Sequence, residues 1–277
     1  MKPFYMATTD QMKELDRRAI EERGIPSIEL MENAATHVAD VVCELMEKHG
    51  LAKKIAIFCS QGNNGGDGVA AARLLMERGY EVRCFLSGNR QKMTDDCKRN
   101  EERLITVGGV LEDLNEITDD VRQWVAGCSC IVDALFGFGL SRDLTGIFAD
   151  VVALINERRY GENEVPEALA AVSRQRVWFK PVEESGCVVI SCDFPSGVNG
   201  NTGQIMGCAV KADVTVTFSC AKPGLFTPPG AMYSRRVKVV DIGIPADLYA
   251  EVGIEPAKML ISQEGTPAES DAEFYKK

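Results

Sequence analysis

Histidine is nearly absent from this chain of 277 residues. Its two histidines, His37 and His49, both lie in sequence with helical spacing of apolar residues. Metal centres built from several imidazoles need more histidines than this, and the helix-like surroundings of both histidines disfavour a triad with a histidine base. The sequence therefore argues against both kinds of chemistry.

Positive charge is also in short supply. The chain has 31 Lys and Arg residues against 41 Asp and Glu residues, a net charge of -10, and no basic stripe. Nucleic acid and anionic membranes are thus poor candidates for the main partner. The sequence contains neither a secretory signal pattern nor an apolar run long enough to cross a bilayer, so we expect a cytoplasmic protein.

Close pairs of cysteine are lacking although cysteines are numerous. Of the ten cysteines, only Cys128 and Cys130 lie close together, and no second pair completes a zinc set. Most of the others stand in apolar segments that resemble strands. We interpret them as reduced core residues rather than as metal ligands or disulfides.

Apolar residues, 45% of the chain, alternate in short strand-like runs and longer helix-like stretches. Two helices are predicted first, at residues 8–23 and from Pro26 to Gly50. This order indicates an α/β domain with a mostly parallel sheet covered on both faces. The strands are predicted at residues 54–59, 81–86, 130–134, 187–192, 213–218 and 236–241, and further helices at 68–78, 95–106 and 145–158.

Two segments interrupt this alternation. Residues 159–186 are polar, and we interpret them as a surface insertion with a short helix near 165–173. Residues 263–277 form a polar tail or linker. The domain itself is assigned to residues 1–262.

The most informative motif is Gln61-Gly-Asn-Asn-Gly-Gly-Asp-Gly68, predicted as a loop between a strand and a helix. Its glycines would expose backbone N–H groups at a helix N-terminus, which favours phosphate binding. Asp67 would repel a phosphate unless a cation or a sugar hydroxyl met its charge. The motif therefore predicts a phosphorylated ligand together with a second group, and a hard monovalent or divalent cation would suit the oxygen ligands available.

Polar residues follow two other predicted strands. After Asp133 come Gly137 and Gly139, then a serine and Arg142, a better set of phosphate ligands than the first motif. Asp193 precedes the rigid turn Pro195-Ser-Gly197. Because ligands of open α/β sheets bind outside the carboxyl ends of the strands, the three clusters predict one site. The alternatives are a plain turn with a solvated arginine, and two aspartates that cap local turns.

Familiar nucleotide-binding motifs fit poorly. A P-loop would need a lysine where Gly68 stands. The segment from Gly66 to Ala71 matches Gly-x-Gly-x-x-Ala, but the acidic residue expected at the end of the next strand is missing. The sequence therefore disfavours a dehydrogenase.

Five segments, in this order, resemble the NAD(P)H-hydrate epimerase family, whose members have a YjeF N-terminal domain. They are residues 62–68, 132–137 with Gly139 and Leu140, 193–197, 222–224 and 240–245. The resemblance covers roughly residues 8–252. It implies a Rossmann-like three-layer αβα sandwich, an isomerase that interconverts the R and S forms of hydrated NADH and NADPH, a potassium ion (K+), and a homodimer.

The resemblance also implies roles for single residues. Asp193 would face the reacting nicotinamide ring, where we expect it to act as general acid–base. Potassium would be held by Asn64, Asp133 and Ser196. The substrate contacts would be Asn63, Asn64, Gly65, Gly66, Asp67, Gly137, Phe138, Gly139, Leu140, Ser141, Arg142, Asp143 and Asp193.

Two departures and two alternatives accompany this resemblance. Cys59-Ser-Gln-Gly62 stands where the family commonly has Gly-Pro-Gly, and Gly137-Phe-Gly139 stands where it has Gly-Thr-Gly, which removes one hydroxyl from the phosphate loop. In bacteria such domains are often fused to an ADP- or ATP-dependent dehydratase, so a fused or separate dehydratase is an expected partner. Other relatives of the fold bind ligands or proteins without catalysis, because a fold alone does not establish activity.

Overall fold

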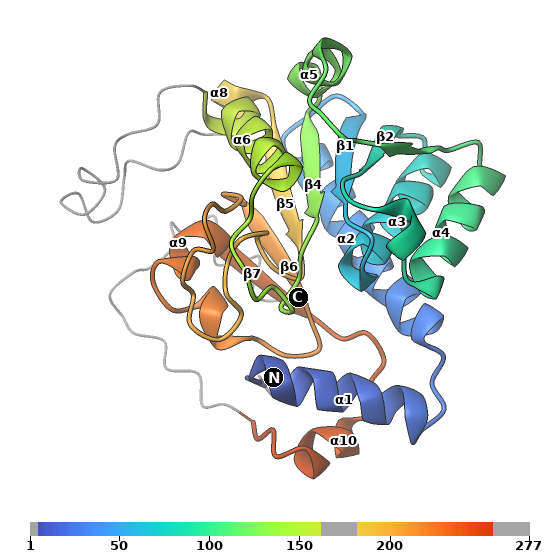
Figure 1. Cartoon of the computed structure of the whole chain (residues 1–277), viewed down its shortest axis with the longest axis vertical. Coiled ribbons are helices and arrows are strands. Elements are labelled where there is room, and N and C mark those ends of the chain that lie inside the picture. The colour runs from blue at the N-terminus through green and yellow to red at the C-terminus, as the bar shows by residue number, and fades with distance from the viewer. Residues whose placement is uncertain (1–4, 162–181, 257–277) are drawn as a thin grey trace.

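The structure is a computed structural model that describes residues 5–161 and 182–256 (Figure 1). Its centre is a seven-stranded sheet in the order β3-β2-β1-β4-β5-β6-β7, with every neighbouring pair parallel. Helices cover both faces of the sheet. The predicted α/β class and the Rossmann-like three-layer sandwich are confirmed.

The strands are β1 (Lys54–Cys59), β2 (Glu81–Leu86), β3 (Leu111–Asp113), β4 (Cys130–Ala134), β5 (Val188–Cys192), β6 (Val214–Phe218) and β7 (Arg236–Val240). The helices are α1 (Thr9–Glu21), α2 (Ser27–Lys48), α3 (Asn63–Glu77), α4 (Asp95–Thr106), α5 (Asp119–Ala126), α6 (Ile147–Tyr160), α8 (Val182–Ser185), α9 (Gly230–Ser234) and α10 (Ala246–Glu251), with 3-10 turns η1 (Arg90–Lys92) and η2 (Pro223–Leu225). The six predicted strands are confirmed to within a residue or so, whereas β3, α5, α8, α9 and α10 were not predicted.

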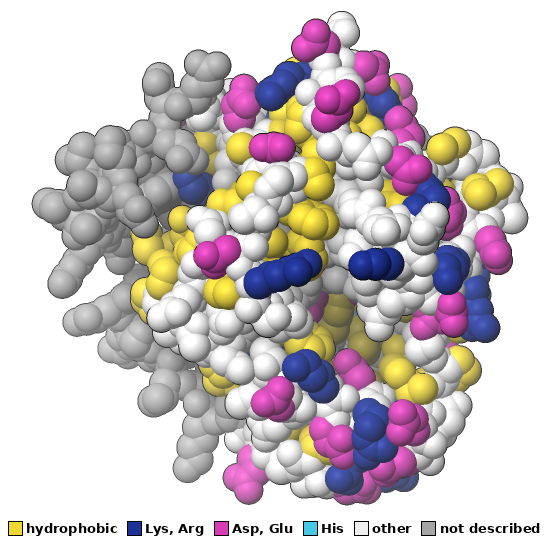
Figure 2. All heavy atoms as spheres, in the orientation of Figure 1, with side chains coloured by type: hydrophobic (Ala, Val, Ile, Leu, Met, Phe, Trp, Pro, Cys, Tyr) yellow, Lys and Arg dark blue, Asp and Glu magenta, His cyan; other side chains and the backbone are white. Residues whose placement is uncertain are grey.

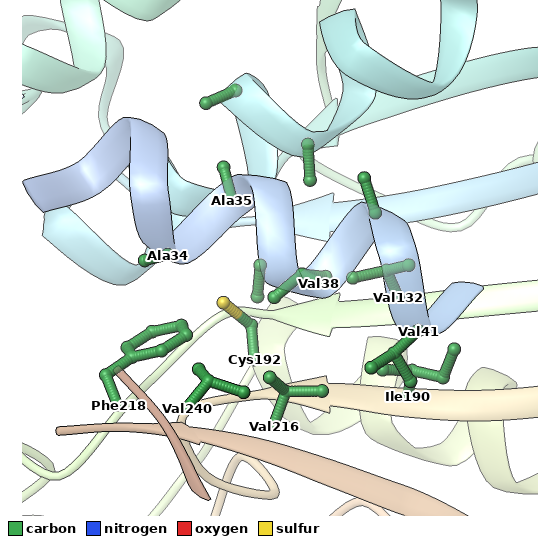
Figure 3. Packing of buried hydrophobic residues seen from close by; sticks show 14 of the residues in the cluster. Ala34, Ala35, Val38, Val41, Val132, Ile190, Cys192, Val216, Phe218 and Val240 are labelled. Carbon is green, nitrogen blue, oxygen red and sulfur yellow. The ribbon is translucent and has the colours of Figure 1, made fainter. Parts of the chain in front are cut away.

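Alternate residues of each strand point to the two faces of the sheet. In β1, Ile55 and Ile57 join the core under α2, α3 and α4, while Ala56 and Phe58 join the core under α5 and α6. Figure 3 shows Val38 of α2 among the aliphatic side chains of the strands. Burial on both faces explains why the central strands β1, β4 and β5 are almost continuously apolar.

The helix predicted at 68–78 begins earlier than expected, and the loop predicted at residues 61–68 is wrong from Asn63 onward. Gly62 is the N-cap of α3, so Asn63 to Gly68 form its first turns. A side chain at Gly65 would place Cβ 1.8 Å from the Ser60 carbonyl oxygen, and one at Gly68 would lie 2.4 Å from Cβ of Ala134. These glycines therefore let the helix press against the ends of β1 and β4, and that packing offsets their poor helix propensity.

Helix α1 runs across the carboxyl ends of the central strands (Figure 1). A capping box is present, because Thr8 and Gln11 bond reciprocally at its start. The backbone N–H of Thr9 donates to Asn201 Oδ1 (2.9 Å), and Gln11 Nε2 donates to the Gly253 carbonyl (3.0 Å). These bonds fix α1 over the strand ends.

The proposed insertion lies partly outside the described residues. Its first two positions, 159 and 160, belong to α6, and its end contains α8. The short helix expected near 165–173 falls within the part of the chain that the structure does not describe, as does the polar tail. None of the helices in the described part of the chain combines the length and apolar composition that crossing a bilayer demands.

Candidate functional site

A cavity of about 550 Å³ opens at the carboxyl ends of β1, β4, β5 and β6. Here the strand order reverses, since β2 lies on one side of β1 and β4 on the other. Such a switch point is where open α/β sheets bind ligands. In Figure 2 the surface is hollowed above the position of α1, with hydrophobic side chains inside the hollow.

Helices α1 and α2 supply one apolar wall of this cavity, and the strand ends supply the polar wall. Of the predicted site residues, those that line the cavity are Asn63, Asn64, Asp67, Gly137, Phe138, Gly139, Leu140 and Asp193. The structure therefore brings residues from all three predicted clusters to one space.

Asp193 follows β5 directly and is fixed by three donors. Its Oδ1 accepts hydrogen bonds from Lys222 Nζ (2.8 Å) and Thr217 Oγ1 (3.0 Å), and its Oδ2 accepts one from the Phe138 N–H (3.1 Å). Its backbone φ is 63°, in the left-handed region that aspartate and asparagine tolerate better than most residues. The carboxylate is thus held in one orientation at the cavity wall.

Lys222 begins one of the segments that carry the family resemblance, but it was not predicted as a site residue. It is fully buried, with 0% exposure, and also donates to Thr217 Oγ1 (2.8 Å) and the Phe218 carbonyl (2.9 Å). Its ammonium lies 5.7 Å from the centre of the Phe138 ring. A buried ammonium is stable only with partners such as these. The signal in the sequence was a lysine shortly after the end of an apolar strand, β6, just as Asp193 directly follows β5.

Three further carboxyl groups line the cavity, those of Asp67, Asp16 and Asp96. Burial raises the pKa of Asp67 well above its ordinary value, and the nearby Asp193, Asp16 and Asp96 carboxylates raise it further. Asp16, on α1, was not predicted as a site residue. Its pKa is raised to about 6 by burial, against the opposing effect of Lys222. The cavity therefore holds carboxyl groups suited to proton transfer.

Asp133 lies behind the cavity rather than in its lining. Its carboxyl accepts hydrogen bonds from the hydroxyls of Ser191 (2.8 Å) and Ser196 (2.5 Å) and from the backbone N–H groups of Ser196 (2.8 Å) and Leu135 (3.3 Å). Burial raises the pKa of Asp133, and these hydrogen bonds oppose that rise. The Ser196 hydroxyl also accepts from the Phe136 N–H (2.9 Å). The pair ties the loop after β4 to the turn after β5.

Asn64 differs from Asp133, because its side-chain amide is buried without a hydrogen-bond partner among the described residues. Neither its Oδ1 nor its Nδ2 makes a hydrogen bond with any described residue. A Cβ at Gly137 would lie 3.3 Å from Asn64 Oδ1 and 2.7 Å from Asp193 Oδ2, so the backbone of Gly137 packs closely against both. Buried unpaired amides are rare in folded proteins, and this one indicates a missing partner.

Five of the predicted substrate contacts do not line the cavity. Gly65 and Gly66 are buried in the packing of α3, and Ser141, Arg142 and Asp143 are exposed beyond its rim. The first-turn N–H groups of α3, which precede the first helical bond from Gly66 to Gly62, do face this end of the sheet. Contacts from these five residues to a ligand stay predictions.

Comparisons with known proteins agree with this architecture. The family described as "YjeF-related protein N-terminus" matches residues 27–224. The chain is 37% identical over 247 residues to the "Bifunctional NAD(P)H-hydrate repair enzyme Nnr" of Thermofilum pendens, a match that covers 89% of this chain and 41% of the relative. It is 34% identical over 241 residues to the "NAD(P)H-hydrate epimerase" of Limosilactobacillus fermentum, covering 84% of this chain and 95% of the relative.

The chain thus spans about two fifths of the bifunctional relative and nearly all of the shorter one. Among solved structures, the crystal structure of yeast ynu0, YNL200c, aligns with a TM-score of 0.68 over 94% of this chain and 98% of its own. Its sequence identity is 20%, so this likeness supports the fold alone.

Proposed function

This chain belongs to the YjeF-related N-terminal family, and from that premise we propose that it is an NAD(P)H-hydrate epimerase. It would interconvert the R and S forms of hydrated NADH and NADPH. The observation that carries the proposal is the convergence of Asp193, Lys222, Asp67 and Asp16 on one cavity at the switch point of the sheet. Relatives that match along most of their length are named for this activity.

The chemistry suits a cavity rich in carboxyl groups. The hydroxyl at C6 of the hydrated ring is adjacent to the ring nitrogen, so its protonation and departure as water leave a cation stabilised by that nitrogen. Water then returns to the other face. Asp193 would act as general acid–base, and the neighbouring carboxyl groups would stabilise the positive charge as it develops.

The rest of the substrate would lie between the N-terminus of α3 and the loop after β4. The unpaired N–H groups in the first turn of α3 favour anions. The loop from Gly137 to Asp143 would follow the phosphates, with Arg142 as its fixed positive charge. Asn63 and Asp67 would contact the nucleotide.

We propose that potassium (K+) is bound beside the substrate. The buried and unpartnered Oδ1 of Asn64 fits such an ion, and the Ser196 hydroxyl keeps an acceptor lone pair beyond its bonds to Asp133 and Phe136. Asp133 already accepts four hydrogen bonds, so it would supply charge, and would coordinate the ion only after releasing a donor. The bound ion would add electrostatic stabilisation of the substrate phosphates.

Replacing potassium with lithium or choline should weaken substrate binding by on the order of tenfold, a usual coupling between two bound species. Asn64→Ala should bind equally weakly in all three salts, while Asn115→Ala, at an exposed position away from the cavity, should keep the wild-type response. Equilibrium binding of hydrated NADH in matched ionic strength provides the measurement. Equal affinities of the wild type in all three salts would exclude the ion.

The family resemblance also implies an assembly, and the sequence pattern led us to expect a location. We propose that the chain forms a homodimer in the cytoplasm, and that a dehydratase, fused or separate, consumes the S form. The bifunctional names of the longer relatives support this partnership. Light scattering of the purified chain would test the dimer.

The activity itself is tested with each pure epimer of hydrated NADH and hydrated NADPH. We expect the protein to bring either epimer to the same mixture faster than an enzyme-free blank, with oxygen-18 from labelled water entering at C6. A protein that binds the hydrates without accelerating their interconversion would instead be the non-catalytic binding module. Formation of oxidised nucleotide would indicate a dehydrogenase.

A further inference from the structure

Epimerisation through loss and return of water involves both faces of the ring. A proton must reach the hydroxyl that leaves from one face, and a proton must be removed from the water that adds to the other. A single carboxyl group would need to reach both faces. Two groups on opposite walls of the cavity would divide the task between them.

Asp16 lies on the wall opposite the strand ends. Met12, Asp16 and Ile20 line the cavity from α1 at intervals of four residues, so they share one face of that helix. Asp193 enters from the end of β5, on the other side. Because α1 is bonded to Asn201 at its start, Asp16 is held in the same rigid body as Asp193.

The carboxyl of Asp16 has no bonding partner among the described residues. Within residues 5–161 and 182–256 it makes no hydrogen bond and no ion pair, whereas Asp193 accepts from three donors. Donors stabilise a carboxylate in its ionised form, which is the form that can take a proton from water. A partly buried carboxyl without donors is suited to carry one.

The charges around Asp16 come from several elements. Lys222 and Cys220 face it from the loop after β6, Asp193 from the end of β5, and Asp67 from α3. On α10, Asp247 and Glu251 are paired with arginines of α1 and the following turn. Burial dominates and raises the pKa of Asp16 to about 6, with Lys222 lowering it and Asp193 raising it.

We propose that Asp16 is the second catalytic acid–base of this site, an inference that rests on the proposed epimerase function. The Asp16 carboxylic acid gives its proton to the C6 hydroxyl on the face towards α1, the C6–O bond breaks, and water leaves. The nitrogen lone pair forms the N1=C6 bond. Water then adds to C6 from the side of β5, its proton passes to the Asp193 carboxylate, and the electron pair returns to nitrogen. The opposite epimer uses the two groups in reverse, and solvent returns the proton between turnovers.

Asp16→Asn tests this assignment, with Asp10→Asn as the matched control on the same helix, where the side chain is 88% exposed. Asn at position 16 keeps the shape but carries no titratable proton. We expect kcat to fall by about 100- to 10,000-fold with little change in KM. Asp10→Asn should keep the wild-type kcat, and circular dichroism should show that both variants are folded.

A pH profile separates proton transfer from a structural role. The wild-type kcat/KM, corrected for the blank at each pH, should fall about tenfold per pH unit above pH about 6 for the epimer that Asp16 protonates, since the free enzyme then loses that proton. The other epimer should show the same limb, because the equilibrium constant between the epimers, and therefore the ratio of their kcat/KM values, does not depend on pH. Asp16→Asn should lack this limb.

The outcomes distinguish a failure of the epimerase function from a failure of the role proposed for Asp16. A wild type no faster than the blank removes the epimerase function itself. An active wild type with Asp16→Asn within about threefold of it leaves the function standing and overturns the role of Asp16. If Asp16→Asn does not fold, the wild-type profile decides, and a flat kcat/KM from about pH 5 to about pH 8 overturns the proposal.

Discussion

Asp193→Asn is expected to lower kcat for interconversion of the epimers by about 100- to 10,000-fold, the usual contribution of a general acid–base. The change removes the carboxylate that accepts from Lys222, Thr217 and the Phe138 N–H. Asparagine tolerates the positive φ of this position, so the backbone should keep its path. Single-turnover rates with each pure epimer provide the measurement.

The matched control is Asp120→Asn, on α5 at the other face of the sheet, where the side chain is 74% exposed. It should leave kcat unchanged. Because Asp193→Asn leaves the Lys222 ammonium buried without its counter-charge, unfolding by urea must be followed in parallel. A folded Asp193→Asn protein with near-normal kcat would remove Asp193 from the mechanism.

Lys222→Met is expected to reduce the free energy of unfolding by about 3–5 kcal/mol, the usual effect of breaking a buried ion pair from one side. Lys222 is fully buried and Asp193 is 4% exposed, so solvent cannot replace the lost charge. Activity should fall as well, since the Asp193 carboxylate loses one of the donors that orient it. Urea unfolding and kcat, measured on the same preparation, test both parts.

The double variant Asp193→Asn/Lys222→Met distinguishes charge from packing. It should be more stable than Lys222→Met, because no unpaired carboxylate remains, yet it should be as inactive as Asp193→Asn. Lys98→Met, at a side chain 48% exposed on α4, serves as the surface control and should change stability by less than about 0.5 kcal/mol. Additive losses in the double variant would contradict the pairing.

Much of the fold was predictable because its signals are local. The strands of a sheet buried on both faces are short apolar runs, and α1 and α2 keep helical spacing over their whole length. The start of α3 was not predictable in this way. Glycines at 65, 66 and 68 look like a flexible loop, and only the approach of Ser60 and Ala134 from elsewhere in the fold explains why they are helical.

The candidate site was predictable where the chemistry stands at a strand end, as with Asp193. The distances between side chains of different loops were not predictable. Sequence order does not reveal that Ser196 donates two hydrogen bonds to Asp133, or that Ser141 to Asp143 are exposed and do not line the cavity. Asp16 was missed for a similar reason. In the sequence, a single aspartate beside the apolar face of a helix is interpreted as solvent-exposed, and only the fold shows that this face packs over the strand ends.

The left-handed backbone conformation at Asp193 limits which residues can occupy this position. Its φ of 63° disfavours nearly every side chain except aspartate, asparagine and glycine, whatever the chemistry requires. Chemistry then selects aspartate from that short set. A relative that lost catalysis but kept the fold would no longer need a carboxylate here, but it would still need a residue that tolerates the positive φ. Asparagine or glycine at this position would therefore mark relatives that bind without turnover, whereas alanine or glutamate would signal a rebuilt turn.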